Sequence, residues 1–138
     1  MKISRISPSE PLPLPFFSAS VAAGFPSPAD DYIESGLDLN EYLVKHPNAT
    51  FLARASGDSM TRAGILDGDH VVVKVQRTAE PGDLVVAGIP GDEGTVKYFE
   101  RDGDTVVLVP ANPAFQELRH PADEVTIFGV VVTVLRRI

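Results

Sequence analysis

The sequence predicts a mainly β domain with one short helix and an extended N-terminal arm. Residues 1–30 are rich in proline and serine, and they follow neither helical nor strand periodicity. After Pro47 the chain alternates short runs of β-branched and aromatic residues with turn residues. Short strands at such regular intervals are typical of an all-β sandwich or barrel. We therefore expect an arm at 1–30 and a β-rich domain at 31–138.

The arm is expected to be extended rather than packed, because its prolines favour polyproline or edge-strand geometry. Lys2 and Arg5, a proline-rich apolar stretch and then Val21-Ala22-Ala23 imitate a secretory signal. Glu10 and four prolines interrupt the helical apolar run that such a signal needs. No stretch approaches the roughly 18 apolar residues of a membrane span. We therefore expect a cytoplasmic protein without a membrane anchor, and the arm leaves no room for a helix-turn-helix.

The β-rich domain is expected to begin with one short helix. Asp38 can cap it, Glu41 is the capping-box partner, and Pro47 ends it. The strands are expected at 51–55, 70–76, 83–88, 95–100, 105–109 and 125–135. The last run is long and nearly all apolar, so it is expected to be a buried strand or part of a subunit interface.

Composition limits the classes of function. The 138 residues contain no cysteine, which excludes disulfides, thiolate metal sites and cysteine nucleophiles. The formal net charge is −7, and basic residues cluster only at Arg136-Arg137, so we expect protein partners rather than direct nucleic-acid binding. The three histidines lack metal-ligand spacing, and we expect no metal or cofactor.

Turn residues account for most of the remaining polar and glycine positions. Gly64, Gly68 and Gly82 are expected to serve turns rather than a phosphate site. Asp67 and Asp69 flank one of these glycines, and we expect both carboxylates to be solvated.

The candidate chemistry lies in Ser59 and in Lys97, 38 positions later. Alone, each has a structural explanation, because serine is common in turns and lysine usually faces solvent. Together they suggest a dyad, because a serine nucleophile needs a base. Lysine can serve as that base if burial lowers its pKa. Strand alternation puts Lys97 on one face with Thr95 and Phe99, where an apolar pocket would have that effect.

The bond between Ala23 and Gly24 is a candidate substrate within the same chain. Small residues flank it, and it lies in the proline-rich arm. A linker turn is the simpler interpretation of this segment taken alone. If the arm folds back, however, well-oriented intramolecular reactions reach effective molarities of about 10⁵ to 10⁸ M, so that a slow dyad would suffice.

The chain resembles the UmuD branch of the LexA-type self-cleaving proteins from about Phe17 to its C-terminus. The order and spacing of five segments carry the resemblance: Gly24-Phe25-Pro26-Ser27-Pro28-Ala29, Ser56-Gly57-Asp58-Ser59-Met60, Asp67-Gly68-Asp69, Thr95-Val96-Lys97 and Phe128-Gly129-Val130-Val131. The candidate bond is Ala-Gly, as in the repressors of this family, whereas UmuD members often carry cysteine before the glycine.

The resemblance implies a LexA/signal-peptidase-like fold and a function. Ser59 would be the nucleophile, Lys97 the general base, and Ala23-Gly24 the scissile bond, with backbone amides near Asp58 and Ser59 stabilising the oxyanion. It also implies an SOS-response protein whose cleavage is stimulated by a RecA filament on single-stranded DNA. The trimmed homodimer would be the accessory subunit of an error-prone translesion DNA polymerase, bound to its catalytic subunit.

The sequence is also compatible with two other functions. The first is a catalytically silent β-rich interaction module that regulates a DNA polymerase. The second is a relative of signal peptidase, which also pairs Ser-Met with lysine and acts on other chains. We rank the signal-peptidase hypothesis last, since we expect no membrane anchor.

Overall fold

The computed structural model describes residues 2–5, 13–17, 33–46 and 49–138. It divides into two compact units. One contains β1 and the described residues from His46 onward, and the other contains β2, β3 and α1. The domain boundary expected at residue 30 falls outside the described residues and stays a prediction.

The smaller unit pairs β2 (Pro13–Phe17) with β3 (Ile33–Asp38) in antiparallel fashion, and α1 (Leu39–Leu43) follows. The helix confirms the sequence prediction. Its N-cap is Asp38, whose carboxylate accepts a hydrogen bond from the Asn40 backbone N–H at 3.2 Å. The helix ends four residues before Pro47, which lies outside the described residues.

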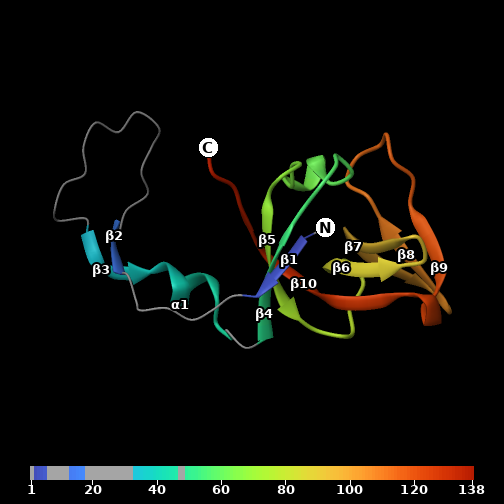
Figure 1. Ribbon diagram of the computed structural model, residues 1–138, viewed down its shortest axis with the longest axis horizontal. Coiled ribbons are helices and arrows are strands. Elements are labelled where there is room, and N and C mark those ends of the chain that lie inside the picture. Colours follow the sequence, from blue (N-terminus) through green and yellow to red (C-terminus); the bar gives the residue numbers. More distant parts are fainter. Residues whose placement is uncertain (1, 6–12, 18–32, 47–48) are drawn as a thin grey trace. The chain divides into compact units, whose positions relative to one another are not determined.

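The larger unit is an antiparallel sheet of eight strands, which confirms the mainly β fold (Figure 1). In order across the sheet, the strands are β1 (Lys2–Arg5), β4 (Thr50–Arg54), β5 (His70–Val75), β10 (Thr126–Leu135), β6 (Leu84–Ile89), β7 (Asp92–Asp102), β8 (Thr105–Val109) and β9 (Leu118–Pro121). Two short 3₁₀ helices, η3 (Thr61–Ala63) and η4 (Ala122–Glu124), lie in the connections.

Tight turns containing glycine set the register of the central hairpins. Pro90-Gly91 joins β6 to β7, and Gly103-Asp104 joins β7 to β8. The backbone φ of Gly91 is +85° and that of Gly103 is +60°, a region that side chains with a Cβ rarely occupy. These turns let β7 run for 11 residues, longer than the sequence predicted.

Apolar side chains pack on both faces of the sheet, as strand alternation requires. Val86 belongs to one core cluster, together with residues of β4 and β5. Its neighbours Val85 and Ala87 belong to a second cluster, together with Phe99 and Leu108. The sheet is therefore held by two cores, and both contain residues of β7, the strand that carries Lys97.

β10 crosses the sheet between β5 and β6 (Figure 1). At Gly129 a Cβ would collide with the Lys74 carbonyl oxygen and with a methyl group of Val73, which explains the glycine. The strand is not fully buried, since most of its side chains are half-buried and Val132 is 54% exposed. The sequence predicted that this strand is either buried or part of a subunit interface. The prediction of a buried strand is wrong for part of β10, because some of its apolar side chains are not covered by this chain.

Four strands were not predicted from the sequence. β1 and β2 lie within the arm, for which edge-strand geometry was one of the expectations. β1 forms an edge of the larger sheet and pairs with β4, so the expectation that the arm is not packed is wrong for Lys2–Arg5. β3 and β9 were also missed. All four segments are short and polar or contain proline. Edge strands of this kind are stabilised by backbone hydrogen bonds rather than by an alternating apolar pattern.

Candidate active site

Ser59 lies in the turn that connects β4 to η3. The start of this turn is tied to the segment before β5 by backbone hydrogen bonds of 2.8 Å, from Ala55 N–H to the Asp69 carbonyl and from Gly68 N–H to the Ala55 carbonyl. The Asp67 carboxylate accepts a further bond from Gly57 N–H at 2.8 Å. Residues 55–60 contain the candidate nucleophile and are named the nucleophile turn. They are therefore fixed at their N-terminal end by the residues around Gly68.

The C-terminal end of the nucleophile turn is held by the loop after β8. Ala111 N–H donates to the Ser59 carbonyl at 2.8 Å, and the Asn112 side-chain amide donates to the Asp58 carbonyl at 2.8 Å. Met60 is buried, and its sulfur lies 3.3 Å from the Ala111 nitrogen. Sequence reasoning missed Asn112. Its one local signal, the Asn-Pro dipeptide, indicates a turn and not a contact with a segment more than 50 residues away.

Lys97 is a buried lysine on β7, with 8% of its surface exposed. Its amine nitrogen Nζ lies 3.0 Å from Ser59 Oγ, 2.7 Å from Thr95 Oγ1 and 3.1 Å from the Val96 carbonyl oxygen. The short distance to Thr95 agrees with the predicted shared strand face. The structure thus brings together the two residues that the sequence singled out.

The surroundings of Lys97 favour its neutral form. Burial lowers the pKa of the amine below its ordinary value of 10.5, because the charged form loses solvation. The negative charge of Asp92 acts in the opposite direction and raises that pKa, but burial is the larger effect. At 3.0 Å, a neutral amine can accept the hydroxyl hydrogen of Ser59.

A cleft of about 310 Å³ opens over the Ser59–Lys97 pair. Its lining includes the apolar residues Met60, Ile65 and Phe115, and its charged residues are Asp58, Asp92 and Lys97. The lining residues are Ala55, Ser56, Gly57, Asp58, Ser59, Met60, Ile65, Asp92, Gly94, Thr95, Val96, Lys97, Phe115, Gln116 and Leu118. Such a cleft suits a short segment of peptide. The candidate substrate, Ala23-Gly24, lies outside the described residues.

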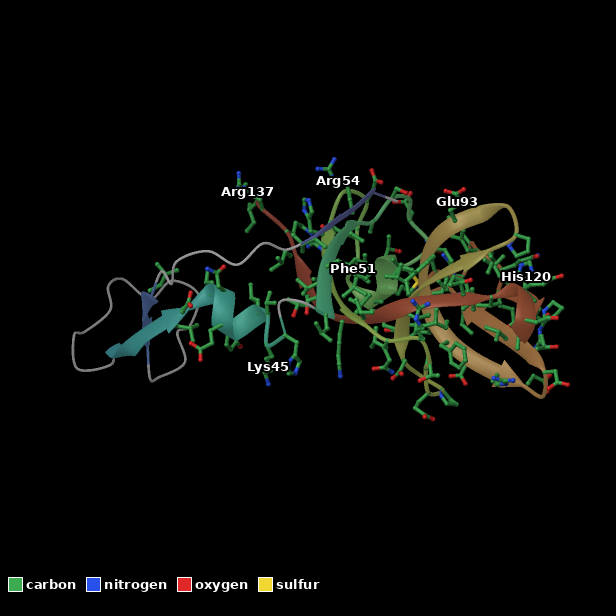
Figure 2. The ribbon with its side chains drawn as sticks, turned by 60° about the horizontal axis from the view of Figure 1, so that its bottom comes forward. Lys45, Phe51, Arg54, Glu93, His120 and Arg137 are labelled. Atoms are coloured by element: carbon green, nitrogen blue, oxygen red, sulfur yellow. The ribbon has the colours of Figure 1, made fainter. Side chains whose placement is uncertain are left out.

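The expectation that Asp69 is solvated is wrong. The residue is 2% exposed, and both carboxylate oxygens accept hydrogen bonds of 2.7 Å from the Arg136 guanidinium. Leu66 N–H also donates to this carboxylate, at 2.8 Å. Arg136 comes from the end of β10, 67 residues away, so no local pattern could reveal the pair. The side chain of its neighbour Arg137 extends away from the ribbon (Figure 2).

The Asp69–Arg136 pair is expected to stabilise the fold. The guanidinium hydrogen bonds hold the pKa of Asp69 at about 2 against the effect of burial, compared with an ordinary value of 3.8. A lowered carboxylate pKa stabilises the folded state above the unfolded pKa, and that contribution is lost as the pH falls toward the folded pKa. Arg136→Gln should therefore lower the melting temperature by several degrees at pH 7, because it leaves a buried carboxylate unpaired.

Thermal unfolding monitored by circular dichroism checks this expectation, with Arg137→Gln as the matched control. The difference between parent and Arg136→Gln should shrink between about pH 4 and pH 2, the window between the two pKa values. Equal melting temperatures at pH 7 would contradict a stabilising role for the pair.

Among the residues that the structure describes, no three or more His, Asp or Glu side chains gather as metal ligands would. Within the same part of the chain, no helix has the length and apolar character needed to cross a bilayer.

Comparisons with known proteins identify the family of this chain. Residues 15–132 match the family described as Peptidase S24-like. The chain is 42% identical to protein ImpA of Escherichia coli and to that of Salmonella typhimurium, over 89% of this chain and 83% of the relative. It is also 42% identical to the LexA repressors of Mycobacterium bovis and Mycobacterium leprae, over 99% of this chain.

The LexA repressors are longer, and this chain spans 57% of their length. The match to the family covers well over half of the chain, and the match to ImpA covers most of both proteins. The chain therefore belongs to the Peptidase S24-like family, in the UmuD branch of the LexA-type peptidases.

Proposed function

We propose that this chain is a self-cleaving serine peptidase of the SOS response, which cuts its own Ala23-Gly24 bond. One observation carries the proposal: the buried amine of Lys97 lies 3.0 Å from the hydroxyl oxygen of Ser59, at the base of a cleft. Membership of a peptidase family supports it independently.

In the proposed reaction, the neutral Lys97 amine takes the hydroxyl proton of Ser59 while Oγ attacks the carbonyl carbon of Ala23. The C=O electrons move to oxygen, and backbone amides near Asp58 and Ser59 stabilise the resulting oxyanion. When the tetrahedral intermediate collapses, the C–N bond breaks and the Lys97 ammonium returns its proton to the nitrogen of Gly24. The products of this step are a free amine at Gly24 and an ester between Ala23 and Ser59.

Hydrolysis of the ester completes the cycle. Lys97 takes a proton from a water molecule, which attacks the ester carbonyl, and the proton then passes to Ser59 Oγ as the ester bond breaks. Thr95 supports both steps, because its hydroxyl oxygen lies 2.7 Å from Nζ and holds the amine in position. Neither step requires a metal or a cofactor.

The arm at 1–30 is the substrate segment in this proposal, and residues 31–138 form the peptidase and dimerisation domain. A homodimer is supported by the half-exposed apolar side chains of β10, among them Val132. From the family resemblance we further infer stimulation by a RecA filament on single-stranded DNA. The trimmed homodimer would then serve a translesion DNA polymerase in the cytoplasm.

Mass spectrometry of the purified chain, incubated at alkaline pH, tests the proposal. Cleavage should yield two fragments, residues 1–23 and 24–138, at a first-order rate independent of protein concentration if each chain cuts itself. An unchanged mass would contradict the proposed activity and favour a silent interaction module on the same fold. Cutting of an added peptide, with the arm left intact, would favour an enzyme that acts on other chains.

A further inference from the structure

The loop after β8 fixes both peptide groups that flank Ser59. Asn112 donates to the Asp58 carbonyl, which shares a peptide group with the Ser59 N–H. Ala111 donates to the Ser59 carbonyl, which shares a peptide group with the Met60 N–H. A peptide group is planar, and in the trans form its C=O and N–H point in opposite directions. A hydrogen bond to either carbonyl therefore also sets the direction of the paired N–H.

The Asn112 amide is itself held at both ends. Its Oδ1 accepts a hydrogen bond of 2.9 Å from Ala114 N–H, and its Nδ2 lies 2.8 Å from the Asp58 oxygen and 3.4 Å from Thr61 Oγ1. The Oδ1 bond fixes which end of the amide faces the nucleophile turn. Asn112 is not among the residues that line the cleft, so it would act on the reaction indirectly, and its shortest contact with the nucleophile turn is the one with the Asp58 carbonyl.

We propose that Asn112 is a positioning residue, which orients the Asp58–Ser59 peptide group so that the Ser59 N–H can donate to the oxyanion. This inference rests on the proposed self-cleavage. Hydrogen bonds weaken steeply as the donor turns away from its acceptor. In a serine peptidase the loss of one oxyanion donor costs about 10²- to 10³-fold in rate. Without Asn112, the Asp58 carbonyl would keep only the longer hydrogen bond of 3.5 Å from Thr61 N–H, so the direction of the Ser59 N–H would be held less firmly.

The test measures the first-order rate of self-cleavage across pH for the full chain and three variants. Asn112→Ala removes the amide. Asn112→Asp keeps an oxygen for Ala114 N–H and replaces the donor with a group that repels the Asp58 carbonyl. Pro113→Ala is the matched control, an exposed residue in the same loop whose side chain donates no hydrogen bond. Circular dichroism and thermal unfolding confirm that each variant is folded. If Asn112→Ala does not fold, Asn112→Asp serves in its place, because it retains the hydrogen bond within the loop.

We expect both Asn112 variants to lower the alkaline plateau of the rate by about tenfold or more, with Pro113→Ala within about twofold of the parent. In Asn112→Ala the midpoint of the pH profile should not move, because the surroundings of Lys97 are intact. A purely structural role would admit water to the cleft, raise the pKa of Lys97 and shift that midpoint upward.

The outcomes distinguish failure of the proposed function from failure of the positioning role. If the parent does not cleave, or if Ser59→Ala cleaves equally well, the proposed function itself fails. If the parent cleaves and the Asn112 variants keep its plateau rate, the positioning role is overturned. It is also overturned if the plateau rate falls only together with an upward shift of the Asn112→Ala midpoint.

Discussion

Ser59→Ala and Lys97→Ala are each expected to abolish self-cleavage while leaving the protein folded. In the proposed reaction, removal of Ser59 Oγ deletes the attacking atom, and removal of the Lys97 amine deletes the group that takes its proton. Loss of a nucleophile or base in a serine peptidase costs up to about 10⁶-fold in rate, so fragments should be undetectable over days. Intact mass spectrometry at alkaline pH, where the parent should be fastest, makes the measurement.

Ser56→Ala is the matched control for the nucleophile, because Ser56 lies in the same turn and is exposed. It should leave the hydroxyl of Ser59 and its contact with Lys97 in place. Lys97→Met complements the alanine variant, since it fills the buried site with an apolar chain of similar length. Cleavage by Ser59→Ala at the parental rate would show that another group attacks the bond.

The stability of these variants offers a second, independent readout. A buried lysine amine loses solvation and so reduces the stability of the fold unless its hydrogen bonds compensate. Lys97→Met should therefore unfold at the same temperature as the parent or at a higher one, although it has lost activity. Residues retained at the expense of stability are typical of functional sites. A large drop in melting temperature would instead assign Lys97 a structural role.

The β fold could be predicted because its central strands carry their pattern locally. Each is a run of β-branched residues bounded by a turn, and Gly91 and Gly103 occupy conformations that the turns require. The edge strands could not be predicted in this way. β9, for example, contains Arg119, His120 and Pro121, and it is held by pairing with β8 and by one apolar residue, Leu118, that packs against the core.

The candidate site was predictable only in part, for a similar reason. Ser59 and Lys97 belong to recognisable segments, whereas the groups that hold them come from distant parts of the chain. Asn112 reaches the nucleophile turn from 54 residues away, and Arg136 reaches Asp69 from 67 residues away. Neither contact follows from local pattern, because each depends on how the sheet brings its loops together. Solvated aspartate was therefore a reasonable but wrong interpretation of Asp69.

Self-cleavage is expected to accelerate with pH, by about tenfold for each pH unit below the pKa of Lys97, and then to level off. The sign follows from the base, since only the neutral amine can take the Ser59 proton. Burial lowers the pKa of Lys97, so the plateau should begin below the pH at which an exposed lysine loses its charge. A rate that stays flat from neutral to alkaline pH would argue against lysine as the base.

Asp92→Asn should move this profile to lower pH. Asp92 lines the cleft, and its negative charge raises the pKa of Lys97 by favouring the ammonium form. Without that charge a larger fraction of the amine is neutral at any pH below the midpoint, so cleavage should be severalfold faster there. The alkaline plateau should be unchanged, because the amine is already neutral in both proteins.

Asp104→Asn controls for the change in net charge, because Asp104 is exposed in the turn between β7 and β8 and lies outside the cleft. It should leave the midpoint where it is in the parent. A general effect of surface charge would shift both variants alike and would weaken in high salt. A shift confined to Asp92→Asn would mean that the carboxylate of Asp92 in the cleft keeps part of the Lys97 population protonated. That carboxylate would then slow self-cleavage at neutral pH.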